Sequence, residues 1–192
     1  MNMNYLLCGV GGQGTVLAAK VLAAAAIAKG EEVKTTETIG MAQRGGSVTS
    51  YVRTGHGIHS PIIPLGAADV IIGFEPGEVV RNIKYLKKGG TVVVSTKSVM
   101  PVTAALTNST YNGDEMVEYI KKAAENVVII DGEKLCNECG SDKVLNVILL
   151  GAAIKSGAVG ITLEETKDAL LKRLPAKLHD LNIKALELGM RG

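Results

Sequence analysis

Short apolar runs alternate with amphipathic or alanine-rich stretches along most of this chain. The apolar runs have the length of buried strands, and glycine or polar residues bound them. This alternation predicts an α/β fold in which right-handed crossovers place helices against a mostly parallel sheet. The predicted strands are Asn4–Cys8, Val33–Glu37, Ser47–Arg53, Asp69–Phe74, Thr91–Ser95 and Val127–Asp131. The predicted helices are Gln13–Lys29, Pro76–Tyr85, Asp114–Glu125 and Asp142–Ser156.

Two stretches depart from this alternation. Ser47–Arg53 alternates apolar and polar residues, and no helix separates it from the segment around Ile58–Ile63. An antiparallel strand pair or a protruding loop is expected there. From Asp142 onward the chain is nearly all helical, and Pro175 divides the last part into two helices. Because no linker rich in Gly, Ser and Pro is present, we expect one Rossmann-like, three-layer domain over residues 1–192, with a helical C-terminal segment.

Composition and charge exclude several classes of function. The 192 residues include 21 basic and 19 acidic side chains, one Phe and no Trp, which does not predict a nucleic-acid surface. The apolar stretch Val16–Ala28 contains Lys20 and is shorter than the roughly 20 residues that a membrane span requires. Three cysteines give no disulfide framework, and the N-terminus lacks the basic region of a signal peptide, so a cytoplasmic location is expected.

A glycine turn follows the first predicted strand. Gly9, Gly11 and Gly14 match G-x-G-x-x-G in a strand–turn–helix context, with Gly12 and Gln13 between them. Glycines permit a tight turn, and a helix N-terminus offers unpaired N–H groups to an anion, so a phosphate-containing ligand is one interpretation. Close packing of the helix on the sheet is the other, and the motif alone favours neither.

Two polar residues extend this motif. Glu37 ends the second predicted strand, near where a dinucleotide fold places its ribose-binding carboxylate. The amide of Gln13 can donate and accept hydrogen bonds, so it is able to bridge the turn to a ligand or to a partner chain.

A second glycine-rich segment, Thr38–Val48, precedes the third predicted strand and contains Gln43, Arg44, Gly45 and Gly46. The guanidinium of Arg44 can bind a carboxylate or a phosphate through two hydrogen bonds. The two glycines after it let another backbone or a ligand approach closely. An arginine of this kind taken alone is more often exposed on a surface turn, but the pair of glycine-rich segments is more informative.

Together these two segments closely resemble the gamma-type domain of the 2-oxoacid:ferredoxin oxidoreductases. The Met-Ala-Gln-Arg-Gly-Gly sequence at residues 41–46 is most similar to the beta subunits of indolepyruvate:ferredoxin oxidoreductases. Relatives that act on pyruvate or 2-oxoglutarate tend to carry Pro-Glu-x-Arg-Gly-Gly instead. The strand end Asp69–Glu75 and the pattern from Leu174 to Gly189 extend the similarity through the whole chain.

The resemblance implies one subunit of an enzyme that oxidatively decarboxylates aryl pyruvates, transfers the acyl group to coenzyme A and reduces ferredoxin. It places thiamine diphosphate, Mg and [4Fe–4S] clusters on a larger alpha subunit. In agreement, the chain has no Gly-Asp-Gly, and its three cysteines are too few for the four thiolates of a [4Fe–4S] cluster. We expect the chain to hold no cofactor and to be inactive alone, to bind the alpha subunit, and to form a homodimer when isolated.

The candidate site combines the glycine turn with the second segment. Arg44 is the residue expected to meet an anionic group, on coenzyme A or on the partner, and Glu37 and Gln13 are expected to position the segment. The complete set is Gly9, Gly11, Gly12, Gln13, Gly14, Glu37, Gln43, Arg44, Gly45 and Gly46.

Two other functions stay open. A stand-alone dinucleotide-binding reductase would have a plain Rossmann strand order, and a non-catalytic assembly protein would leave the activity of its partner unchanged. Neither the Cys136/Cys139 pair nor the pair His56/His59 indicates a further site. The cysteines are expected as small residues on a helix or turn, and the histidines as surface loop residues.

Overall fold

The computed structural model describes residues 2–39, 45–100 and 110–192. These residues contain a six-stranded sheet with the order β2-β3-β1-β4-β5-β6. Neighbouring strands are parallel from β1 through β4 and β5 to β6, whereas β3 is antiparallel to both β1 and β2. The strands are β1 (Met3–Val10), β2 (Glu32–Ile39), β3 (Ser47–Gly55), β4 (Ala68–Gly73), β5 (Leu86–Ser95) and β6 (Asn126–Ile130).

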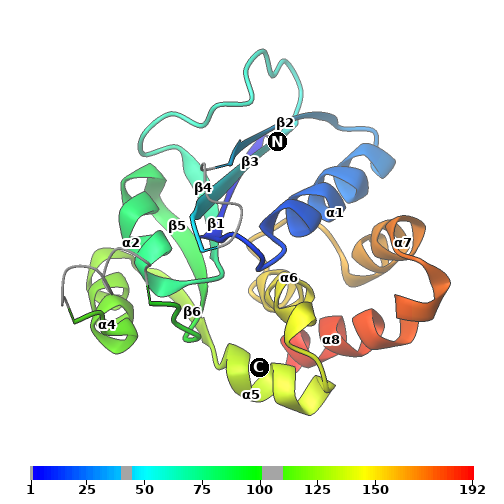
Figure 1. Cartoon of the computed structure of the whole chain (residues 1–192). Coiled ribbons are helices and arrows are strands. Elements are labelled where there is room, and N and C mark those ends of the chain that lie inside the picture. Colours follow the sequence, from blue (N-terminus) through cyan, green and yellow to red (C-terminus); the bar gives the residue numbers. More distant parts are fainter. Residues whose placement is uncertain (1, 40–44, 101–109) are drawn as a thin grey trace.

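Helices cover both faces of this sheet, which confirms the predicted α/β architecture (Figure 1). One face carries α1 (Thr15–Ala28), α5 (Gly132–Cys139), α6 (Leu145–Lys155), α7 (Leu163–Arg173) and α8 (His179–Arg191). The other face carries α2 (Pro76–Asn82) and α4 (Gly113–Ala123). Short 3₁₀ turns occupy Ile83–Tyr85, Asp142–Val144 and Ala176–Leu178. As predicted, the C-terminal third is helical and Pro175 separates its last two helices.

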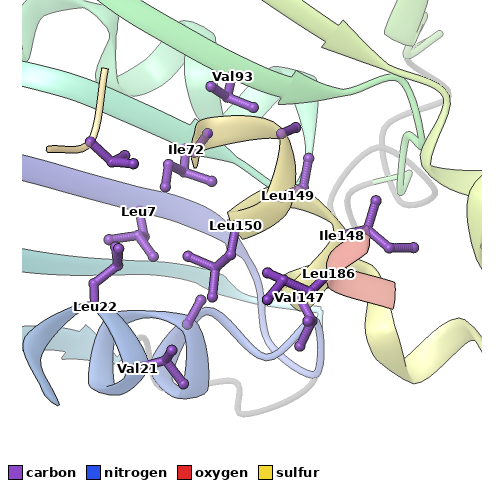
Figure 2. Packing of buried hydrophobic residues seen from close by; sticks show 14 of the residues in the cluster. Leu7, Val21, Leu22, Ile72, Val93, Val147, Ile148, Leu149, Leu150 and Leu186 are labelled. Atoms are coloured by element: carbon purple, nitrogen blue, oxygen red, sulfur yellow. The ribbon is translucent and has the colours of Figure 1, made fainter. Parts of the chain in front are cut away.

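The central strands are buried on both faces. Leu7 and Ile72 pack toward α1 and α6 (Figure 2), whereas Leu6 and Ile71 pack with Val79 of α2 on the opposite face. Strands that are covered on both sides need continuous apolar runs rather than alternation, which is why these runs stand out in the sequence. Burial of apolar surface in both layers fixes the sheet register and so the position of every strand end.

The antiparallel pairing expected at Ser47–Arg53 forms with β1 and β2, and the segment around Ile58–Ile63 is a loop. Two other elements differ from the sequence prediction. β5 begins at Leu86 rather than Thr91, because the register with β4 shifts between the pairs Ala68–Leu86 and Val70–Thr91, and this irregularity takes up Gly89 (φ +72°) and Gly90. Helix α5 was not among the predicted helices. Its 8 residues are too few to show a clear apolar periodicity, and its start is fixed by the Asp131 side chain, which caps it.

Candidate functional site

The carboxyl ends of β1 and β4 lie side by side at the point where the chain changes faces. After β1 the chain enters α1 on one face of the sheet, and after β4 it enters α2 on the other. Ligands of open α/β sheets bind at such switch points, outside the carboxyl ends of the strands. The glycine turn at residues 9–14 lies here, so the fold places the first predicted motif where binding is favoured.

The glycines of this turn differ in why a side chain is excluded at each position. A Cβ on Gly9 would stand 2.8 Å from Cβ of Phe74, and one on Gly14 would stand 2.7 Å from Nδ2 of Asn146. Gly14 also has φ +81° and is the N-cap of α1. Gly12, in contrast, has φ +102° with open space where its Cβ would be. Close packing therefore explains Gly9 and Gly14, whereas Gly12 leaves its side of the turn open.

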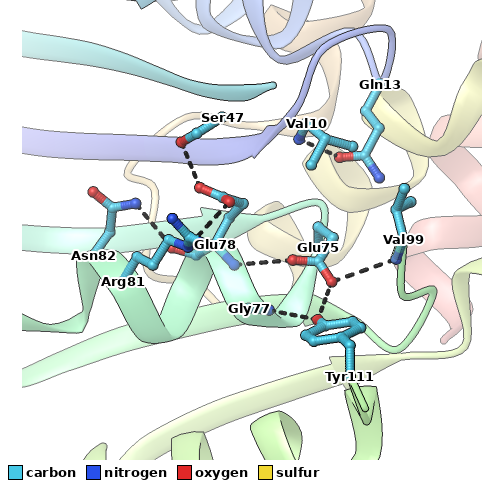
Figure 3. Close-up of polar contacts among 10 residues, drawn as sticks. All are labelled: Val10, Gln13, Ser47, Glu75, Gly77, Glu78, Arg81, Asn82, Val99 and Tyr111. Atoms are coloured by element: carbon cyan, nitrogen blue, oxygen red, sulfur yellow. Dashed lines mark hydrogen bonds and ion pairs between the residues drawn. The ribbon is translucent and has the colours of Figure 1, made fainter. Parts of the chain in front are cut away.

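Gln13 joins the ends of two strands. Its Oε1 accepts a hydrogen bond from the backbone N–H of Val10 at 2.8 Å (Figure 3), and its Nε2 donates to the carbonyl of Phe74 at 3.2 Å. The sequence predicted an amide that bridges the turn to a ligand or a partner. In the structure this amide joins the end of β1 to the residue that follows β4 and so restrains the turn.

The two glycine-rich segments are hydrogen-bonded to each other. The N–H of Gly11 donates to the carbonyl of Gly46 at 2.8 Å, and the N–H of Gly45 donates to the carbonyl of Gly11 at 3.4 Å. These bonds continue the β1–β3 ladder, in which Val10 pairs with Ser47. Gln43 and Arg44 lie outside the described residues. The structure thus brings the turn and the Gly45–Gly46 end of the second segment together, as one backbone unit.

Glu37 is not part of this unit. It lies on the edge strand β2 and pairs with Ser50 of β3, which separates β2 from β1. Two strand spacings amount to about 10 Å, so the carboxylate is not placed on a strand next to the turn. With Lys20 of α1 and Arg173 of α7 it lines a separate groove of about 290 Å³. The plain Rossmann order expected for a stand-alone dinucleotide-binding reductase is therefore not formed.

A buried carboxylate at the end of β4 is the first of two acidic residues near the turn that the sequence motifs did not predict as site residues. Glu75 is 3% exposed, and its side chain caps α2 by accepting a hydrogen bond from the N–H of Glu78 at 2.9 Å. It also accepts hydrogen bonds from the N–H of Val99 at 3.4 Å and from the Tyr111 hydroxyl, which in turn accepts from Gly77 (Figure 3). The signal in the sequence is a glutamate directly before a proline that starts a helix.

The second acidic residue is Glu78, one turn further along α2. Its side chain is 8% exposed, and its Oε2 accepts a hydrogen bond from the Ser47 hydroxyl at 2.5 Å. Nε of Arg81 lies 3.5 Å from its Oε1. The two glutamates thus link α2 to the start of β3 and to the segment around Tyr111, next to the glycine turn.

Burial controls the protonation of neighbouring groups. Burial, with Glu78 and Glu75 nearby, raises the pKa of the Cys8 thiol well above its usual range. Burial also raises the pKa of Cys136 to about 11 and that of Cys139 above its usual value. The hydroxyl of Tyr111 has a raised pKa because it is buried and hydrogen-bonded to Glu75. These thiols stay protonated near neutral pH, which does not suit a nucleophile.

This protonation predicts slow reaction with thiol reagents. At pH 8 we expect the thiols of the folded chain to react about 100-fold more slowly than those of the unfolded chain, because their thiolate fraction is lower and access is restricted. Timed labelling with and without denaturant measures the ratio, and all three cysteines should label in denaturant. Rapid labelling of Cys136 or Cys139 in the native chain would contradict this expectation.

The whole chain resembles one group of known proteins. Residues 4–192 match the model of the pyruvate ferredoxin/flavodoxin oxidoreductase family. The indolepyruvate oxidoreductase subunit IorB of Pyrococcus horikoshii is 38% identical over 190 residues, which cover 98% of this chain and 94% of that protein. The corresponding subunit of Archaeoglobus fulgidus is 35% identical, with the same coverage.

Solved structures agree with this likeness. The crystal structure of a keto/oxoacid ferredoxin oxidoreductase gamma subunit from Geobacter sulfurreducens is similar with a TM-score of 0.70 and 25% identity. The match covers 98% of this chain and 96% of that one. Within the described residues, no helix has both the length and the apolar character needed to cross a membrane. Because the family model spans nearly the full sequence, the chain belongs to the pyruvate ferredoxin/flavodoxin oxidoreductase family.

Proposed function

We propose that this chain is the beta subunit of a cytoplasmic indolepyruvate:ferredoxin oxidoreductase, which performs coenzyme A-dependent oxidative decarboxylation of aryl pyruvates. The observation that carries this proposal is similarity to IorB subunits over the full length of the chain. Four archaeal IorB subunits are 33–38% identical to it over 98% of its residues. The common gamma subunits of pyruvate/ketoisovalerate oxidoreductases are less similar, at 28% identity or below.

In this proposal the redox chemistry belongs to the alpha subunit. A [4Fe–4S] cluster requires four thiolates, whereas this chain has three cysteines, which lie buried in β1 and α5. Thiamine diphosphate, Mg and the iron–sulfur clusters are accordingly assigned to the partner, and ferredoxin to the assembled complex. This chain supplies a folded surface that completes the active-site cleft. Without the partner, the same surface would support a homodimer.

The paired glycine segments are the part of that surface that we assign to coenzyme A. Hydrogen bonds between Gly11 and Gly45–Gly46 fix the backbone directly after Arg44 at the switch point of the sheet. The guanidinium of Arg44 can bind an anion through charge-assisted hydrogen bonds. We assign this contact to an anionic group of coenzyme A, and the open side of Gly12 leaves room for the ligand.

The substitution Arg44→Ala tests this assignment. In the assembled complex we expect the KM for coenzyme A to rise about 10- to 100-fold, since hydrogen bonds to charged groups contribute 1.5–3 kcal/mol. Arg44→Lys should recover part of the affinity, because it keeps the charge but loses the bidentate geometry. Arg191→Ala, at an exposed position at the end of α8, is the control and should leave the KM unchanged. An Arg44→Ala complex that assembles and turns over aryl pyruvates with unchanged coenzyme A dependence would exclude the assigned role.

A further inference from the structure

The Glu78–Ser47 hydrogen bond connects the two sides of the switch point. Ser47 is the first residue of β3 and comes directly after the Gly45–Gly46 pair of the second glycine segment. Its hydroxyl donates to Oε2 of Glu78 at 2.5 Å (Figure 3). The carboxylate thus reaches from the α2 layer to the end of a segment that is otherwise bonded to the glycine turn of β1.

Capping of α2 does not require Glu78. Glu75 is already the N-cap of this helix, and it is the backbone N–H of Glu78, not its side chain, that Glu75 satisfies. Burial of a carboxylate is unfavourable unless strong partners compensate. The partners of Glu78 are the Ser47 hydroxyl and Arg81, whose own side chain is 65% exposed. One carboxylate oxygen of Glu78 is therefore directed to the end of the second glycine segment, while the other lies near Arg81 of its own helix.

The C-terminal end of the second glycine segment is consequently restrained by two elements, the glycine turn and α2. The backbone of Gly46 accepts the N–H of Gly11, and the side chain of the next residue, Ser47, is bonded to Glu78. A hydrogen bond to a carboxylate is shorter and stronger than one between neutral groups. Loss of this bond would leave only the backbone pairing of β1 with β3 and the two hydrogen bonds of Gly11 to restrain the junction.

We propose that Glu78 is a positioning residue: through Ser47 it fixes the end of the second glycine segment on the glycine turn and so tightens binding of the anionic ligand. This inference rests on the proposed function, because the ligand at these segments is the coenzyme A assigned above. Glu78 itself does not contact the ligand. Its negative charge would repel an anion, so its effect is expected on affinity through geometry, and not on the chemical step.

The test uses the complex assembled with the partner subunit and four variants: Glu78→Ala, Glu78→Gln, Ser47→Ala and the double variant Ser47→Ala/Glu78→Ala. Three quantities are measured for each variant: hydrogen exchange of the peptide that contains Gly9–Gly14, the KM for coenzyme A and kcat. Glu118→Ala, an exposed glutamate of α4 that pairs with Lys121, is the matched control.

We expect Glu78→Ala and Ser47→Ala each to accelerate exchange at the Gly11 amide, and each to raise the KM about tenfold with kcat nearly unchanged, as for loss of a hydrogen bond to a charged group. The double variant should be no worse than either single variant, because both remove the same bond. Glu78→Gln keeps an oxygen acceptor for the serine and should recover most of the affinity.

The possible results distinguish the positioning role of Glu78 from the assignment of coenzyme A to this site. Unchanged exchange in Ser47→Ala, or fully additive effects in the double variant, would overturn the positioning role of Glu78. A raised KM in Arg44→Ala with an unchanged KM in Ser47→Ala and Glu78→Ala would also overturn it while supporting the proposed function. An unchanged KM in every variant, Arg44→Ala included, would overturn both the ligand assignment and the positioning role.

Discussion

The substitution Gly189→Ala is expected to lower the free energy of unfolding by about 3 kcal/mol, near the upper end of the cost of overpacking a close contact. Helices α6 and α8 cross where Gly189 faces the backbone of Ile148, and a Cβ at this position would overlap the Ile148 carbonyl oxygen. Gly151 of α6 faces the Leu186 carbonyl of α8 in the same way. Backbone atoms cannot turn aside as a flexible side chain can, so the two helices must move apart.

Urea or thermal unfolding of the isolated chain measures this effect. For a chain of this length, a loss of 3 kcal/mol corresponds to a decrease in Tm of about 9 °C. Arg191→Ala, at an exposed position on the same helix, should change the stability by less than about 0.5 kcal/mol. Alanine favours a helix by up to 1 kcal/mol over glycine, so an unchanged or raised Tm for Gly189→Ala would show that the crossing is looser than the structure indicates.

The substitution Gly9→Ala has the second large expected effect, about 2–3 kcal/mol of stability together with loss of ligand affinity. The new methyl group would stand 2.8 Å from Cβ of Phe74 and 2.6 Å from Oε1 of Gln13. Gln13 can move only by giving up its bond to Val10, so the strain is transmitted to the whole turn.

Gly12→Ala is the matched comparison, because it lies in the same turn with nothing within 4 Å of its Cβ. Its cost should be about 1–2 kcal/mol, from the left-handed φ of +102° alone. Denaturant midpoints of the two variants give the comparison, and the KM for coenzyme A of their complexes shows the functional part. Equal destabilisation by both substitutions would mean that packing against Phe74 is not what selects glycine at position 9.

Sequence patterns predicted the layers of the fold because buried strands and alanine-rich helices have distinctive periodicity. Val33–Glu37 and Ser47–Arg53 were correctly predicted as strands. Their order in the sheet depends on contacts between distant segments, and periodicity along the sequence does not reveal such contacts. The insertion of β3 between β2 and β1 is such a contact. It is the reason that Glu37, at a spacing typical of a dinucleotide fold, lies away from the glycine turn.

Only part of the candidate site could be predicted from the sequence, and the reason is related. The glycines were identifiable because their spacing between a strand and a helix is local information, and the structure pairs Gly11 with Gly45 and Gly46. The roles of Glu75 and Glu78 depend on partners far along the chain, Tyr111 and Ser47. Such partners are brought together only by the completed sheet, so the residue types alone did not reveal them.

Coenzyme A-dependent reduction of ferredoxin by indolepyruvate, assayed with this chain, with the alpha subunit and with both, tests the division of roles most directly. We expect no activity and no thiamine or iron in the chain purified alone, cofactors on the alpha subunit, and full activity only when the two are combined. Thiamine, an iron–sulfur cluster or decarboxylation of indolepyruvate found with this chain alone would contradict it, as would full activity of the alpha subunit without it.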